Sequence, residues 1–128
     1  NTPMTEVVTP QGTVVGARAG GLHVFRGVPF AAAERFAPPR PPAPRPRVDA
    51  TAFGPPAPQN PDRLERFWGE PLAPGDEACL TLNVWTPDPH GPPKPVLVWV
   101  HGGAFLIGSG RWPYADPSAL AARGLVVV

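Results

Sequence analysis

Cysteine is almost absent from this chain of 128 residues: its single copy, Cys79, has no second cysteine with which to form an internal disulfide. Nothing in the sequence therefore requires an oxidising compartment. Long apolar runs are also absent, since no stretch approaches the roughly 18 residues of a membrane helix. The N-terminus lacks the basic-then-apolar pattern of a signal peptide. We expect no membrane partner and a cytoplasmic protein, with secretion left open.

An excess of either sign of charge is absent as well. Eleven Lys and Arg residues face ten Asp and Glu residues, so the formal net charge is only +1. This balance removes the bulk electrostatic attraction on which nucleic-acid binding relies, and we expect no nucleic-acid partner. His23, His90, His101 and Cys79 show no metal-ligand spacing, and no phosphate-binding or dinucleotide fingerprint is present. We therefore expect no metal and no cofactor.

Proline and glycine are abundant, with 22 and 14 copies, which indicates long stretches of irregular chain. Hydrophobic residues still make up 42% of the chain, and the net charge is small. A disordered chain usually combines few apolar residues with a high net charge. The composition therefore predicts apolar strands joined by proline-rich loops, and it argues against a helix bundle.

The first half of the chain divides into strands and a long loop. Residues 5–8, 12–17 and 22–25 are apolar and β-branched and are separated by turn residues, which predicts a small antiparallel sheet. Residues 38–61 hold ten prolines, a density that no helix or central strand tolerates, so we expect an extended loop. Residues 62–69 fit one or two helical turns.

The second half has a different pattern. Residues 80–85 alternate between apolar and polar, whereas residues 96–100 and 125–128 are uninterrupted apolar runs. Such runs are typical of strands covered on both faces in a mostly parallel sheet. Residues 118–123 fit a helix that Asp116 caps and Gly124 ends, so a βαβ unit with a right-handed crossover is expected.

The last apolar run ends at Val128 with no turn or cap after it. A parallel sheet of so few strands would leave apolar faces and an open edge in water. We therefore expect residues 1–128 to be the N-terminal fragment of a single α/β domain that continues beyond Val128. The segment after Val128 is then the main partner of these residues.

One motif carries a chemical signal. The sequence His101-Gly-Gly-Ala-Phe105 follows a predicted buried strand and precedes a predicted helix. Glycines at such a place let the backbone turn sharply and direct N–H groups into open space. These groups can hold the negative oxygen that forms when a carbonyl is attacked, as in the HGGG-type loop of lipases and esterases. A purely architectural tight turn is the alternative interpretation.

Several further motifs occur in a fixed order along the chain. They are residues 25–31 (FRGVPFA), 35–36 (RF), 50–54 (ATAFG), 77–85 (EACLTLNVW), 95–105 (PVLVWVHGGAF) and 108–109 (GS). Together they resemble the N-terminal part of the type-B carboxylesterases, a family that includes bacterial para-nitrobenzyl esterases and animal cholinesterases. The resemblance implies an α/β-hydrolase fold with a deep gorge, a small-molecule ester substrate, and a Ser-His-Glu/Asp triad that works through an acyl-enzyme.

The resemblance assigns roles to the residues of the glycine loop. Gly103 and Ala104 match the family's oxyanion donors, which act through their backbone N–H groups. Gly102 matches the glycine that lets the loop bend. Phe105 and Leu106 match positions near the acyl site or the gorge wall.

Other matches lie outside the loop. Trp68 falls near an aromatic residue that lines the gorge in some members. Arg35 and Glu77 match positions that pair, so we expect a partly buried salt bridge between the proline-rich loop and the strand at residues 80–85. Ala57 stands where secreted members have a disulfide partner for the cysteine, which implies that Cys79 is a free, buried thiol.

No residue of this chain is assigned to the triad. The nucleophile motif G-x-S-x-G is absent, because Ser109 lies in Ile-Gly-Ser-Gly, which has the wrong spacing. In the hydrolase order the nucleophile, the acid and the histidine follow the glycine loop. His101 is therefore interpreted as a residue that positions the loop, with direct proton transfer as the less favoured role.

Three functions are compatible with these residues. The leading hypothesis is a serine carboxylester hydrolase. The second is an acyltransferase or condensing enzyme of secondary metabolism on the same scaffold, in which the acyl group passes to something other than water. The third is a non-catalytic, cholinesterase-like binding protein that kept the fold and lost the triad. A serine in a downstream G-x-S-x-G motif favours an enzyme, and another residue at that position favours the binding protein.

Overall fold

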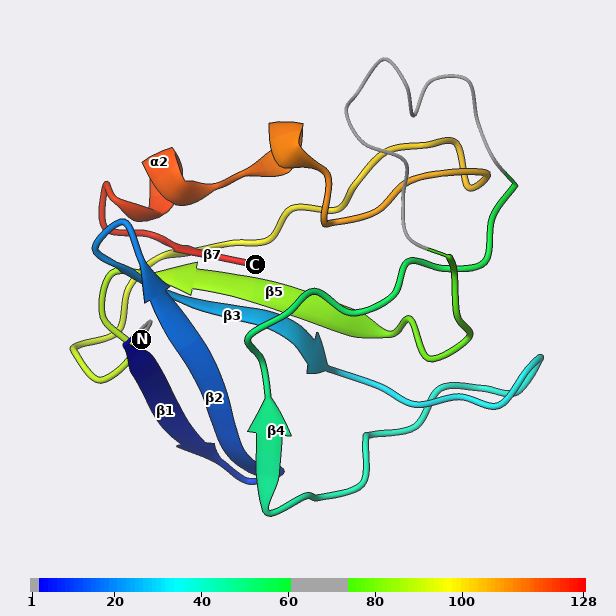
Figure 1. Ribbon diagram of the computed structural model, residues 1–128, viewed down its shortest axis with the longest axis horizontal. Coiled ribbons are helices and arrows are strands. Elements are labelled where there is room, and N and C mark those ends of the chain that lie inside the picture. Colours follow the sequence, from blue (N-terminus) through cyan, green and yellow to red (C-terminus); the bar gives the residue numbers. More distant parts are fainter. Residues whose placement is uncertain (1–2, 61–73) are drawn as a thin grey trace.

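The computed structural model of the protein describes residues 3–60 and 74–128 (Figure 1). Its elements are β1 (Met4–Thr9), β2 (Gly12–Ala19), β3 (Leu22–Pro29), β4 (Arg47–Asp49), β5 (Thr81–Thr86), β6 (Val96–Leu97), the 3-10 turn η1 (Pro113–Ala115), α2 (Ser118–Ala121) and β7 (Val126–Val127). In this part of the chain the strands form one mixed sheet in the order β1-β2-β3-β5-β7-β6, with β4 beside β2. The helical turns predicted for residues 62–69 lie outside the described residues.

The small antiparallel sheet predicted for the N-terminus is confirmed. β1 pairs with β2 from Met4↔Ala17 to Thr9↔Gly12, and β2 continues into β3 through the turn at Gly20 and Gly21. Gly12 has φ +129°, and a Cβ at this residue would overlap the carbonyl oxygen of Arg45. Only glycine therefore allows the proline-rich loop to pass so close to the start of β2.

The proline-rich loop contains one short strand that the sequence did not predict. β4 runs parallel to β2, with Val14 opposite Val48, and Val48 packs against the buried Val14. This strand is only three residues long and lies off the main strand order. The strand lies in a stretch without proline, between Pro46 and Pro55. Proline has no backbone N–H to donate, so strand pairing is possible only where prolines are absent.

The N-terminal strands and the second half of the chain share one sheet. β3 pairs antiparallel with β5, with Val24 opposite Trp85. The register shifts between Phe25 and Val28, and there the Gly27 N–H donates to Asn83 Oδ1 at 2.9 Å. β5 pairs antiparallel with β7. β6 and β7 form the parallel pair that was expected from the βαβ unit. Within the described residues the sheet is thus mostly antiparallel rather than mostly parallel.

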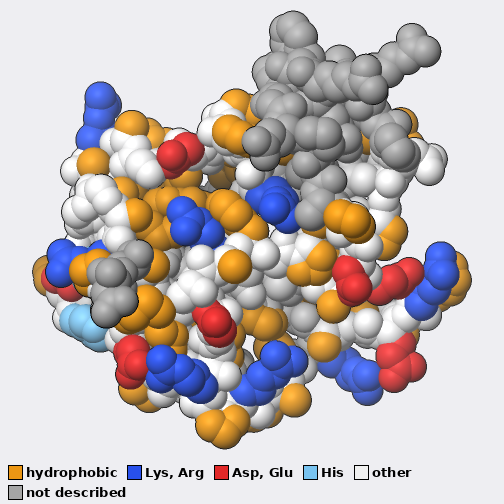
Figure 2. Space-filling view, viewed as in Figure 1, with side chains coloured by type: hydrophobic (Ala, Val, Ile, Leu, Met, Phe, Trp, Pro, Cys, Tyr) orange, Lys and Arg blue, Asp and Glu red, His pale blue; other side chains and the backbone are white. Residues whose placement is uncertain are grey.

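Two groups of buried side chains lie against this sheet. The first consists of Leu22, Val24, Trp85, Ala121 and Val127, and Figure 1 shows α2 on that side, next to β7. The second consists of Val14, Phe25 and Ala50. Acidic and basic side chains are interspersed over the face that Figure 2 shows.

The apolar run at residues 96–100 differs most from its prediction. The strand β6 covers only two residues, and Val96, Val98 and Val100 are 61%, 68% and 82% exposed. The expected burial on both faces is therefore wrong for the described residues. An apolar run indicates a strand whose two faces need to be buried, but the burial itself depends on other segments that pack against it. No described segment packs over these side chains.

The helix after the glycine loop is shorter than predicted. It spans Ser118–Ala121 instead of 118–123, and Gly124 with φ +97° follows it. The Asp116 carboxylate accepts hydrogen bonds from the N–H and the hydroxyl of Ser118 at 2.9 and 2.5 Å. These bonds lower the pKa of Asp116, so the carboxylate binds the first turn in its charged form.

Candidate functional site

The glycine loop begins directly after the apolar run at residues 96–100, of which only Val96 and Leu97 belong to β6. The Trp99 N–H donates to Val128 O at 2.7 Å, so the backbone ladder between β6 and β7 ends just before the loop begins. Gly103 then adopts φ +128°, a conformation that side-chain-bearing residues rarely adopt. A Cβ on Gly103 would also overlap the carbonyl oxygen of Ile107. The requirement for glycine at this position is therefore both conformational and steric.

Two residues without the freedom of glycine follow in left-handed conformations. Ala104 has φ 53° and Phe105 has φ 61°. This region costs L-residues roughly 1–2 kcal/mol each, and such strain persists only where the surroundings impose it. The Gly103 carbonyl accepts the N–H groups of Leu106 and Ile107 at 2.9 and 3.1 Å, which closes the loop into a tight turn.

This turn leaves two backbone donors unused. Within residues 3–60 and 74–128, neither the N–H of Gly103 nor that of Ala104 finds a hydrogen-bond acceptor. Gly103 is half-buried and Ala104 is exposed, so both N–H groups are open to water or to a bound acceptor.

The residues before the turn have less demanding geometry. Gly102 is exposed, and nothing described lies within 4 Å of a Cβ built on it. The His101 Nδ1 lies 2.8 Å from the carbonyl oxygen of Gly102, at the base of the loop. The loop-bending role of Gly102 and the loop-positioning role of His101 stay predictions.

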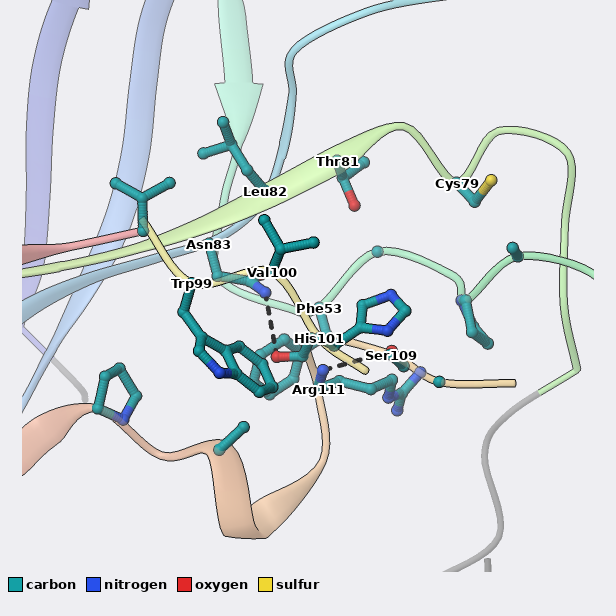
Figure 3. A pocket seen from close by; sticks show the side chains of 18 of the residues that line it. Phe53, Cys79, Thr81, Leu82, Asn83, Trp99, Val100, His101, Ser109 and Arg111 are labelled. Atoms are coloured by element: carbon teal, nitrogen blue, oxygen red, sulfur yellow. Dashed lines mark hydrogen bonds between the residues drawn. The ribbon is translucent and has the colours of Figure 1, made fainter. Parts of the chain in front are cut away.

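The loop forms one side of a pocket of about 920 Å³ (Figure 3). The other walls come from residues 53–59, the β5 region at 79–85 and the exposed run at 97–101. Phe105 and Leu106 line this pocket and are exposed to solvent, whereas Gly102, Gly103 and Ala104 are not among its lining residues. The predicted wall residue Trp68 lies outside the described part of the chain.

Cys79 also lines the pocket. Its thiol is free, as expected, but it is half-buried rather than buried. Cys79 lies just before β5, where the chain is still irregular.

Phe53, Trp85 and Arg111 line the pocket, and Arg26 stacks on the two aromatic rings. The Arg26 guanidinium lies 5.0 Å from the ring centre of Phe53 and 5.9 Å from that of Trp85, and Arg111 lies 5.9 Å from Phe53. Cation–π attraction stabilises such stacking. Of the two guanidiniums, that of Arg111 lines the largely apolar pocket directly.

Two amide side chains that the sequence analysis did not single out hold the loop in place. Gln59 accepts the Gly108 N–H at 2.8 Å and donates to the Gly108 carbonyl at 3.0 Å. Asn83 donates to Gly110 O at 3.4 Å, a contact drawn in Figure 3. Asn83 belongs to the motif at residues 77–85 that resembles the family. Gln59 is a single amide in the proline-rich loop, and nothing in the local sequence indicates its contact with the glycine loop.

The predicted pair of Arg35 and Glu77 is present, with Arg35 Nε at 3.3 Å from Glu77 Oε1. Its expected partial burial is wrong, because the two side chains are 73% and 54% exposed. The loop and the start of the β5 region meet at the surface, where water screens both charges. The pair therefore joins two surface segments and contributes little stability.

A sequence model of the carboxylesterase family matches residues 3–128. The chain belongs to this family. It is 45% identical over 127 residues to a probable N-octanoylanthranilate hydrolase of Rhodococcus erythropolis, covering 95% of this chain and 28% of that protein. It is 42% identical over 127 residues to the para-nitrobenzyl esterase of Bacillus subtilis, covering 95% and 26%.

Solved structures agree with this family assignment. A structure of a PNB esterase superposes with a TM-score of 0.86 at 40% identity, covering 95% of this chain and 26% of that one. The predicted resemblance and the α/β-hydrolase class are therefore confirmed. The chain spans about a quarter of the length of the curated relatives it matches.

Metal-binding clusters and membrane-spanning helices are both absent from the described residues. These residues contain no group of three or more His, Cys, Asp or Glu side chains placed to hold a metal ion. None of their helices has the length and apolar character needed to cross a bilayer.

Proposed function

We propose that this chain is the N-terminal part of a serine carboxylester hydrolase and that residues 101–108 supply its oxyanion loop. The observation that carries the proposal is the pair of N–H groups on Gly103 and Ala104, which have no acceptor among the described residues and lie in a strained turn. The next residues of that turn, Phe105 and Leu106, line a largely apolar pocket. Family membership supports ester hydrolysis as the chemistry.

The proposed reaction uses a serine and a histidine supplied by a segment beyond Val128. The serine oxygen attacks the ester carbonyl carbon while the histidine takes the serine proton, and the carbonyl π electrons move to oxygen. The N–H groups of Gly103 and Ala104 stabilise that oxygen anion. The carbon–oxygen bond to the alcohol then breaks, and the histidine proton goes to the leaving alcohol. Water repeats the sequence on the acyl-enzyme and releases the acid.

The pocket supports a small-molecule ester as the substrate. Its lining is largely apolar, and Phe105 and Leu106 offer apolar surface beside the proposed donors. We further propose a cytoplasmic location, because the free thiol of Cys79 is compatible with a reducing compartment.

The proposal is tested on the full-length protein with p-nitrophenyl acetate in a stopped-flow instrument. A serine hydrolase releases a burst of p-nitrophenol equal to the enzyme concentration and then turns over steadily, because the acyl-enzyme accumulates. Release of free acetate in proportion to p-nitrophenol distinguishes hydrolysis from acyl transfer to an added alcohol or amine. A protein that shows neither burst nor turnover, but binds the ester, is the non-catalytic relative, and the proposal is then wrong.

A further inference from the structure

Gln59 makes an unusual two-way contact with the far end of the glycine loop. Its side-chain oxygen accepts the Gly108 N–H at 2.8 Å, and its side-chain nitrogen donates to the Gly108 carbonyl at 3.0 Å. These two residues are 49 positions apart. We propose that Gln59 is a positioning residue that sets the geometry of the oxyanion donors through Gly108. This inference rests on the proposed function of the loop.

The Gln59 side chain is itself held firmly. Its nitrogen also donates to Ala57 O at 3.1 Å, and the preceding Pro58 has a fixed φ. The buried Pro56 accepts the Asp76 N–H at 3.0 Å, so the segment before Gln59 is tied to the chain that returns toward β5. The amide therefore enters the loop region from a rigid support and loses little side-chain entropy on binding Gly108.

Gly108 passes this restraint on to the donors by direct backbone contact. It is buried with φ +124°, and a Cβ on it would overlap His101 Nδ1 and the Gly102 carbonyl oxygen. The carbonyl of the preceding Ile107 lies against the α-carbon of Gly103, where it leaves no room for a methyl group. A shift of Gly108 therefore displaces the Gly102 carbonyl, which shares a peptide group with the Gly103 N–H. It also displaces the Ile107 carbonyl, which lies against the α-carbon of Gly103.

Only a primary amide satisfies both Gly108 groups. The chemistry of Gln supplies one acceptor and two donors, whereas Glu supplies only acceptors and Met supplies neither. In Gln59→Glu a carboxylate would face the carbonyl oxygens of Gly108 and Ala57. In Gln59→Met the half-buried position keeps its length and packing but leaves the buried Gly108 N–H without an acceptor, which is costly.

The test compares Gln59→Met and Gln59→Glu in the full-length enzyme, with p-nitrophenyl acetate as substrate. We expect kcat to fall about 10- to 100-fold while KM changes less than about three-fold, since the donors act mainly on the transition state. The affinity for a trifluoromethyl ketone, which mimics the tetrahedral intermediate, should fall in parallel. Gln11→Met and Gln11→Glu are matched controls, because Gln11 is the exposed amide of the β1–β2 turn.

Either of two results overturns the inference. One is a kcat within about three-fold of the parent for both Gln59 variants. The other is a loss of activity that only parallels a loss of folded protein in thermal melting, which indicates a structural role. A selective fall in kcat with unchanged melting supports the inference.

Hydrogen–deuterium exchange separates this inference from the proposed function. Peptides covering residues 101–110 should exchange faster in Gln59→Met than in the parent, with residues 12–25 unchanged, because the Gly108 N–H loses its acceptor. An inactive parent protein overturns the proposed function, and the exchange experiment still decides whether Gln59 holds the loop. Unchanged exchange at residues 101–110 overturns the positioning role.

Discussion

Replacing Gly103 with alanine adds one methyl group at the tightest point of the glycine loop. The new Cβ would lie 2.7 Å from the Ile107 carbonyl carbon and closer still to its oxygen. Carbon atoms in contact prefer about 3.5–4.0 Å, so the turn must open by roughly 1 Å. The φ of +128° is in addition unfavourable for alanine, so the backbone of residue 103 must rotate as well as shift.

The displacement moves the two proposed donors directly, because the Gly103 N–H and the Ala104 N–H flank the altered α-carbon. A misplacement of about 1 Å in a catalytic site can cost about 10²-fold in rate. Loss of one oxyanion donor costs about 10²–10³-fold in kcat. We therefore expect Gly103→Ala to lower kcat by about 10²-fold or more, with a much smaller change in KM, since both donors stabilise the transition state.

The assay measures kcat and KM of the full-length enzyme for p-nitrophenyl acetate, with thermal melting as the check on folding. Gly124→Ala is the matched control, because Gly124 also has a positive φ, +97°, but nothing lies within 4 Å of a Cβ built on it and it does not line the pocket. Its kcat should stay within about three-fold of the parent. A folded Gly103→Ala enzyme with equally small changes would refute the assignment of this loop as the oxyanion site.

Three further predictions concern stability, each measured on the full-length protein. Arg35→Ala should change the free energy of unfolding by only about 0–1 kcal/mol in urea titrations, because its partner Glu77 is exposed, and a loss above about 2 kcal/mol contradicts this. Asp116→Ala should lower the melting temperature at neutral pH. Because the pKa of Asp116 is lowered from 3.8, this difference should shrink below pH 3.8 and vanish only once the pH is below the lowered pKa, and a difference that persists in stronger acid contradicts it. Trp85→Ala should cost about 3–5 kcal/mol in urea, since Trp85 packs in the first buried group, and a loss under about 1 kcal/mol contradicts this.

The sequence alone determined the features that depend on neighbouring residues. The alternation in residues 5–25 predicted the antiparallel strands, and the Gly-Gly pair after residues 96–100 located the loop. The ordered motifs identified the family, because they are short local patterns with characteristic residue types. These properties follow from backbone preferences and from side-chain chemistry within a few positions along the chain.

The tertiary structure alone decided which distant segments meet. It joined β3 to β5, added β4 beside β2, left the run at residues 96–100 without a described covering segment, and placed the pair of Arg35 and Glu77 at the surface. It also brought Gln59 to Gly108, a contact that no spacing in the sequence indicates. The physical reason is that burial and hydrogen-bond pairing depend on what lies opposite a residue in space, and a local pattern records only what a segment requires.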